Sequence, residues 1–290
     1  MYVDRVHVKK AFAEYTAAYN ADDPKIKLKI DHTYRVAALC ERIAKAAGMS
    51  AYDIELAWLS GMLHDVGRFE QIKRYNTFSD ADSVDHAKFG ADLLFKDGLI
   101  STFLKGMVKS TGYKPGALED RYDSDGVFLY DRLNKSDMEM LELAIRCHNM
   151  YRIPQGLNRR EQAFCNVLRD ADKVDINLRF NIDTPLEEIY NTTTEELMKS
   201  DITDEVLKAF DEEHCILKAI RRTPADTVIG HVSLAYELVY DESVRITVEQ
   251  GYLAKLMHFH SDNEETNRKM AMVREKMDSY VKKRIGEKDA

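Results

Sequence analysis

The sequence predicts an all-α protein, and three observations support this fold class. First, its 290 residues include only 13 glycines and 5 prolines, about half the average usage of these turn-forming residues. Second, helix N-terminal capping signals recur along the chain, and each is followed by apolar residues at helical spacing. Third, no stretch alternates apolar and polar residues between turn signals, so a large sheet is not expected.

The helices follow from these signals in chain order. A first long helix is predicted over 24–47, because Asp23 is a favourable N-cap, Pro24 suits the first helical position and Gly48 stands where a helix often ends. Similar N-terminal signals predict helices that begin after Ser50, Ser83, Ser136, Asn158, Thr223 and Ser261. Helices therefore account for most of the expected structure.

Two segments lack helical patterning. Residues 69–82 and 110–127 are expected to be irregular, and the second carries much of the turn chemistry of the chain. Long loops in compact domains are often functional, although a plain surface excursion is equally compatible with this composition. No linker-like tract divides the sequence. We expect one helical domain over 1–180 and a C-terminal helical extension over 181–290 that packs on it.

Composition limits the function classes. The net charge of −8 argues against a general nucleic-acid-binding surface, but it is compatible with a local basic pocket for a small anion. The apolar runs are too short for a transmembrane helix, and the N-terminus lacks the pattern of a secretory signal. The four cysteines form no CxxC pair, so reduced thiols in a cytoplasmic protein are expected. The charged segment 262–290 suits a solvated helix or one that packs in a homo-oligomer.

One histidine–aspartate pair stands in an informative context. His64 and Asp65 end an apolar helix that begins near Ile54, and Gly67 follows them. Adjacent residues of one helix point about 100° apart, so the two side chains converge only where the helix end faces a cavity. An aspartate buried at such a place needs compensation, and a divalent cation supplies it.

The surrounding sequence resembles the HD-domain superfamily of metal-dependent phosphohydrolases. The signature of that superfamily is a histidine, a histidine–aspartate pair on the next helix and a distant aspartate on a later helix. Here His32 in DHTYRVAALCERIA, the pair His64 and Asp65 in WLSGMLHDVGRF, and Asp172 in LRDADKVD match it in order and context. The resemblance covers roughly residues 25–180 and implies an HD-type helical bundle in which these four residues bind metal.

Two further histidines extend the resemblance. Members with two metal ions carry two more histidines between the pair and the last aspartate, and His86 and His148 stand in those places. The resemblance therefore implies a binuclear centre with Asp65 between two divalent transition metal ions. Imidazole and carboxylate ligands suit Fe or Mn first, with Zn, Ni or Co as alternatives. The two-metal subgroup includes the HD-GYP type. The GYP part of the HD-GYP signature is absent from this sequence, so the specific activity of that type is not assigned.

Two assignments near the motif involve a choice between alternatives. Asp170 and Asp172 are two residues apart on one predicted helix and cannot both face the same site, and the motif favours Asp172. Arg68 shares a face with the pair if the helix continues past Gly67, and it would then bind a phosphate oxygen of the substrate. A structural ion pair is the alternative role for Arg68.

The expected function is hydrolysis of a phosphate ester or phosphoanhydride by a metal-activated water. Asp65 and Arg68 are the expected catalytic residues, and the substrate is a small phosphorylated molecule, nucleotide-like or other. A di-iron oxygenase with the same ligand order is one alternative. A non-catalytic ligand-binding regulatory module is another, although it would not need a complete ligand set.

Overall fold

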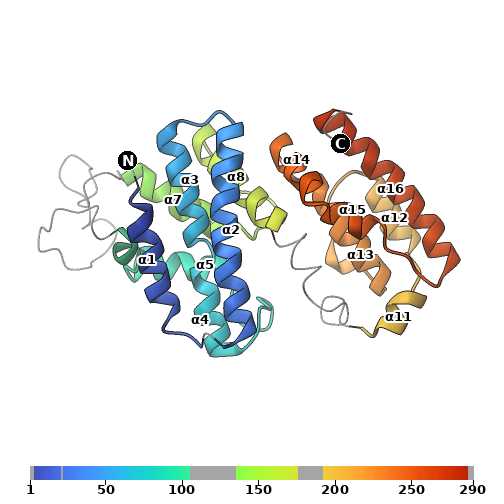
Figure 1. Ribbon diagram of the computed structural model, residues 1–290, viewed down its shortest axis with the longest axis horizontal. Helices are drawn as coiled ribbons and strands as arrows, with labels where there is room; N and C mark the ends of the chain where they lie inside the picture. Colours follow the sequence, from blue (N-terminus) through green and yellow to red (C-terminus); the bar gives the residue numbers. More distant parts are fainter. Residues whose placement is uncertain (1–2, 21, 105–134, 176–191, 287–290) are drawn as a thin grey trace, which may run out of the picture. The chain divides into compact units, whose positions relative to one another are not determined.

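The computed structural model describes residues 3–20, 22–104, 135–175 and 192–286. The chain forms two compact units, Met1–Asp172 and Lys173–Ala290. The described residues form helices and no strands (Figure 1), so the predicted all-α fold class is confirmed. The predicted irregular segment 110–127 lies outside the described residues.

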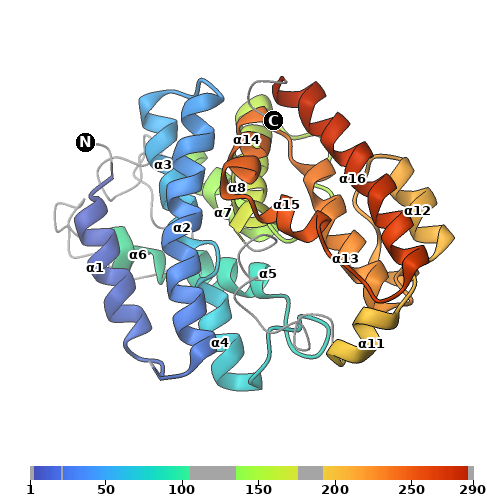
Figure 2. The ribbon, with the colours of Figure 1, turned by 45° about the vertical axis from the view of Figure 1, so that its right-hand side comes forward.

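The first unit is built around a helical hairpin. Its elements are α1 (Arg5–Thr16), α2 (Pro24–Ala46), α3 (Ala51–Leu63), α4 (Val66–Tyr75), α5 (His86–Ala91), the π-helical turn η1 (Asp92–Lys96), α6 (Ile100–Leu104), α7 (Lys135–Cys147) and α8 (Arg159–Asp175) as far as Asp172. Helices α2 and α3 pack along each other (Figure 1), and α4 and α7 both contact α5. Helix α1 contacts α6 (Figure 2). A Cβ built on Gly61 would lie 2.6 Å from the Ala37 Cα, so only glycine lets α3 approach α2 this closely.

The second unit has its own core. Its elements are α11 (Thr194–Lys199), α12 (Asp204–Asp211), η4 (Lys218–Ile220), α13 (Pro224–Val232), η5 (Ser233–Glu237), α14 (Asp241–Gln250), α15 (Tyr252–Met257) and α16 (Glu264–Ile285). The long helix α16 packs against α12, α14 and α15 (Figure 2). Buried Asp226 accepts backbone N–H bonds from Thr203 and Arg222, so it fastens the start of α13 to the start of α12.

Several predicted helix starts agree with the structure. Asp23 and Ser50 accept backbone N–H bonds at the starts of α2 and α3. Asn158 and Glu161 bond reciprocally at the start of α8, and Thr223 forms a capping box with Asp226 at α13. In each case the signal depends on residues two or three positions apart, which one sequence contains completely.

Four predictions of local structure were wrong. Ser136 does not precede a helix, because it lies inside α7, which spans Lys135–Cys147. Residues 69–75 continue helix α4, because Gly67 lies in its first turn rather than at its end. Asp85 rather than Ser83 caps α5, since the Ser83 hydroxyl instead bonds Gln71 and the Ser79 carbonyl. Asn263 caps α16, whereas Ser261 donates to the Met198 carbonyl of α11. Ser83 and Ser261 both form hydrogen bonds with other segments instead of capping a helix.

Among the described residues, none of the helices combines the length and apolar character that a membrane span requires.

Candidate metal centre

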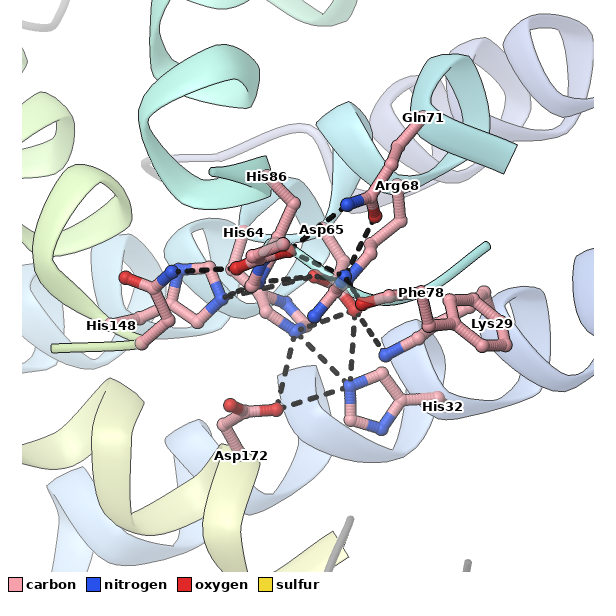
Figure 3. Close-up of polar contacts among 12 residues, drawn as sticks. Lys29, His32, His64, Asp65, Arg68, Gln71, Phe78, His86, His148 and Asp172 are labelled. Carbon is pink, nitrogen blue, oxygen red and sulfur yellow. Dashed lines mark hydrogen bonds and ion pairs between the residues drawn. The ribbon is translucent and has the colours of Figure 1, made fainter. Parts of the chain in front are cut away.

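The histidine–aspartate pair lies at a break between two helices. Helix α3 ends at Leu63, and α4 begins at Val66. Asp65 has φ −104° and ψ 14°, outside the helical range. This break removes the divergence of adjacent helical side chains, and both His64 and Asp65 point into one cluster (Figure 3). His64 and Asp65 can therefore face the same cluster because α3 ends just before them.

The first half of the centre combines three elements. The His32 Nε2 atom of α2 lies 3.2 Å from His64 Nε2, 3.2 Å from Asp172 Oδ1 of α8 and 3.4 Å from Asp65 Oδ2. His64 Nε2 lies 3.6 Å from Asp172 Oδ1 and 3.5 Å from Asp65 Oδ2. The four side chains predicted from the signature therefore converge on one point, and the aspartate beside the histidines is Asp172.

The second half lies on the other side of Asp65. His86 Nε2, from the start of α5, is 3.0 Å from His148 Nε2, which follows α7. These nitrogens lie 3.6 and 3.8 Å from Asp65 Oδ1. Each oxygen of Asp65 thus faces one of the two halves (Figure 3). All six predicted ligand residues are brought together.

Hydrogen bonds fix the orientation of three imidazole rings. His64 Nδ1 lies 2.7 Å from the Gly61 carbonyl, and His148 Nδ1 lies 2.7 Å from the Ile145 carbonyl. A carbonyl can only accept, so each Nδ1 carries the proton and each Nε2 presents a lone pair to the centre. Both rings use a carbonyl that a helix C-terminus leaves unsatisfied. His86 Nδ1 instead bonds the carboxylate of Asp80 at 2.7 Å.

The two central carboxylates are buried and ionised. Burial alone would raise the pKa of Asp65, but the ammonium of Lys29 and the neighbouring imidazoles hold that pKa well below its usual value. Lys29 Nζ lies 2.7 Å from Asp65 Oδ2, and both side chains are almost fully buried. Burial likewise opposes the ionisation of Asp172, whose pKa is held low by His32 and His64. Both residues can therefore act as anionic ligands at neutral pH.

The histidines of the second half are neutral. Burial, reinforced by the nearby His86 and His64, lowers the pKa of His148 to about 3. Burial also lowers the pKa of His86, although its hydrogen bond to Asp80 acts in the opposite direction. Neutral imidazole is the form that binds a metal ion, so the surroundings prepare both rings for ligation.

The donor atoms fit a metal better than they fit one another. The Nε2 atoms of His86 and His148 face each other at 3.0 Å although both rings carry their proton on Nδ1. Oδ1 of Asp65 and Oδ1 of Asp172 are buried and accept no aligned hydrogen bond within the described residues. Donors about 2.0–2.2 Å from a shared ion lie about 3 Å apart. Opposed lone pairs at this spacing fit a bound cation.

Arg68 lies beside the centre but is largely engaged elsewhere. Helix α4 continues past Gly67, so Arg68 shares the face of Asp65, with its Nε 3.7 Å from Asp65 Oδ1. Its Nη1 donates to the Gln71 side chain, the Phe78 carbonyl and Asp80. The sequence left open a structural role and a role in binding substrate, and these contacts show that the structural role is present.

Sequence reasoning missed two residues of the site, Lys29 and Asp80. A signal existed for Lys29, because it falls among Ile26, Thr33 and Val36 in the buried stripe of α2. A lysine within an apolar stripe indicates a buried partner. No comparable signal existed for Asp80, which lies in the segment between α4 and α5 and bonds His86 only in the folded chain.

Two glycines determine how closely α5 approaches the pair. A Cβ on Gly67 would lie 2.4 Å from the His86 carbonyl oxygen and 2.6 Å from the Gly90 nitrogen. A Cβ on Gly90 would lie 2.9 Å from the Gly67 nitrogen. The backbones of α4 and α5 therefore touch directly, and this contact brings His86 to Asp65.

Comparison with known proteins identifies the family of the chain. The HD domain family matches residues 30–177, about half of the chain, and includes all six clustered side chains. The chain therefore belongs to the HD domain family. Members of this all-α family bind divalent metals and are commonly metal-dependent hydrolases. Searches of curated proteins and of solved structures found no match to this chain.

Proposed function

We propose that the chain is a phosphohydrolase with a binuclear metal centre, acting on a phosphate ester or phosphoanhydride of a small molecule. The observation that carries this proposal is the position of Asp65, with Oδ2 toward His32 and His64 and Oδ1 toward His86 and His148. Nucleotides and other small phosphorylated compounds are the substrate classes we propose.

In this proposal each half of the centre holds one divalent ion. His32, His64 and Asp172 would bind the first, His86 and His148 the second, and Asp65 would join them. We propose Fe or Mn, with Zn, Ni or Co as alternatives, because imidazole and carboxylate ligands suit these ions. Such ions activate a water molecule and neutralise charge on a phosphoryl group.

Two basic side chains would orient the substrate anion. Arg68 Nη2 makes no hydrogen bond to any residue that the structure describes, although Nη1 makes three. We assign that free N–H face to a phosphate oxygen. Lys29, paired with Asp65 and 5.6 Å from the Phe78 ring centre, adds a second positive charge at the centre. Arg68 and Asp65 are thus the proposed catalytic residues.

Elemental mass spectrometry of untagged protein, purified without chelator, tests the centre first. We expect close to two transition metal ions per chain. Hydrolysis of p-nitrophenyl phosphate, bis(p-nitrophenyl) phosphate and a panel of nucleotides should then depend on the metal. Oxygen consumption by the iron-loaded protein without phosphate release would instead support an oxygenase. Failure to retain Mn, Fe, Co, Ni or Zn after reloading would rule out the centre.

The proposed compartment is the cytoplasm. The four cysteines are buried free thiols in the structure, which suits a reducing environment.

A further inference from the structure

The segment between α4 and α5 is attached to the metal centre through one carboxylate. Asp80 receives the Nδ1–H of His86, with distances of 2.9 Å to Oδ1 and 2.7 Å to Oδ2. It also accepts from Arg68 Nη1 at 3.0 Å and from Gln71 Nε2 at 3.0 Å. Asn149, the residue after His148, donates to the same carboxylate at 3.2 Å.

The donors to Asp80 are themselves held in place. Gln71 is wholly buried, and its Nε2 also donates to the Ser83 hydroxyl at 2.8 Å and to the Val84 carbonyl at 3.0 Å. Asp80 therefore connects helix α4, the end of α7 and the first residue of α5. Contacts from three parts of the fold therefore hold its carboxylate in place.

His86 needs such a partner because of its place in the fold. His64 and His148 each follow a helix and donate to a carbonyl of the helix's last turn. His86 is the first residue of α5, and the free backbone groups at a helix N-terminus are N–H donors. No carbonyl of α5 can accept from its ring. An acceptor from outside the helix must fix the tautomer instead, and here the Asp80 carboxylate occupies that position.

We propose that Asp80 is a positioning residue that orients His86 to bind the ion of the second half. An ionised carboxylate only accepts, so it keeps the proton on Nδ1 and leaves the Nε2 lone pair facing His148 and Asp65. This inference rests on the proposed binuclear centre. It adds that the second half depends on the segment before α5, whereas the first half does not.

Titration of the metal-free chain with Mn²⁺ tests the proposal, by equilibrium dialysis and electron paramagnetic resonance. Wild type should bind two ions with the spectrum of a coupled pair. Asp80→Ala should bind the second ion about 10–100-fold more weakly and retain the first, with the spectrum of isolated Mn²⁺. Asp80→Asn keeps an oxygen that can accept from His86 and should recover part of the affinity.

Two controls separate positioning from general disturbance of the segment. Asp82→Asn removes an exposed carboxylate two residues away and should leave both ions bound. Ser83→Ala removes a contact of Gln71 but none of His86, and it should also retain both. The double variant His86→Asn with Asp80→Ala should bind Mn²⁺ as His86→Asn alone does, because the two residues act on the same ion.

The outcomes distinguish the two proposals. Two ions bound by Asp80→Ala with wild-type affinity would overturn the role of Asp80 and leave the centre intact. Equal weakening of both ions in Asp80→Ala would also overturn it, because the effect would not be specific to the second half. If wild type itself binds neither Mn²⁺ nor any of the alternative ions Fe, Co, Ni and Zn, the centre fails, and the role of Asp80 fails with it.

Discussion

Asp65 is the residue on which both halves of the centre depend. Its oxygens divide between two pairs of histidines, and its charge is matched in the metal-free chain by the buried ammonium of Lys29. Asp65 therefore has two roles, as the proposed bridging ligand and as the partner of a buried cation. These roles respond differently to substitution.

Asp65→Asn should abolish metal retention and lower phosphoesterase activity by about 100-fold or more, because it removes the bridge from both ions. It also leaves Lys29 without its anionic partner, and breaking such a buried pair costs about 3–5 kcal/mol. Elemental analysis and urea denaturation measure the two effects. Asp31→Asn, an exposed neighbour of His32, is the matched control and should behave as wild type. An Asp65→Asn protein with full activity would refute the proposed function.

Acid pH should destabilise the metal-free protein through His148. The folded chain holds the pKa of this residue at about 3, while the unfolded chain has the ordinary value of about 6.5. Between these values the unfolded state binds more protons, so the free energy of unfolding falls as pH decreases from 6.5 toward 3. The slope contributed by one such group is at most about 1.4 kcal/mol per pH unit.

Urea denaturation of chelator-treated protein at pH 7, 6 and 5 measures this slope. His148→Asn removes the titrating ring and should give a flatter profile. An identical pH profile for wild type and His148→Asn would show that the ring does not titrate as its burial requires.

The residues of the site differ in how far sequence predicts them. The six clustered side chains follow from the order and context of the motif, and Asp172 was separated from Asp170 in the same way. Lys29 and Asp80 did not follow, because their roles depend on distances set by tertiary packing. Arg68 was placed on the correct face, but its bonds to Phe78 and Asp80 depend on a segment whose path no local pattern specifies.

At the scale of elements, the approach of α5 to α4 positions the second half of the centre. Gly67→Ala should destabilise the chain by about 1–3 kcal/mol and weaken binding of the second ion, because the new Cβ meets the His86 backbone. Gly48→Ala is the matched control. It is strained by a φ of +69° but has no atom within 4 Å of the added Cβ. It should cost about 1 kcal/mol and leave metal binding unchanged.

Urea denaturation and Mn²⁺ titration of the two variants check this prediction. Equal metal binding in both would mean that the contact between α4 and α5 does not position His86.

The same contact also shows the limit of sequence reasoning about elements. Capping signals located α2, α3, α8 and α13, yet the continuation of α4 past Gly67 was missed, because a glycine near a helix start has the same local signature as one at a helix end.

At the scale of the whole molecule, the centre lies within the first compact unit. Metal binding should therefore stabilise that unit selectively, by about 2.7 kcal/mol when the free ion is at 100 times its dissociation constant. Hydrogen exchange followed by mass spectrometry should show that chelation lowers protection in α2, α3, α5 and α7. Protection in α13 to α16, which belong to the second unit, should not change.

A uniform loss of protection across both units would contradict this expectation.

The all-α class and the family of the first unit followed from composition and motif. The second unit offered helix signals but no residue pattern that indicates chemistry. Its core depends on contacts such as those of Asp226, which joins segments more than twenty residues apart. The sequence predicts domains at 1–180 and 181–290, and that division remains a prediction. The structure forms compact units at 1–172 and 173–290.

The contact between Gly67 and Gly90 limits how the chain can tolerate change. A clash with a side chain can be relieved by trimming that side chain, but here the added methyl would meet backbone atoms that every amino acid has. In a genetic selection for revertants of Gly67→Ala, point substitutions on the facing surface of α5 should not recover function. Suppressors should instead alter the length of the segment 76–85, because that segment sets where α5 begins.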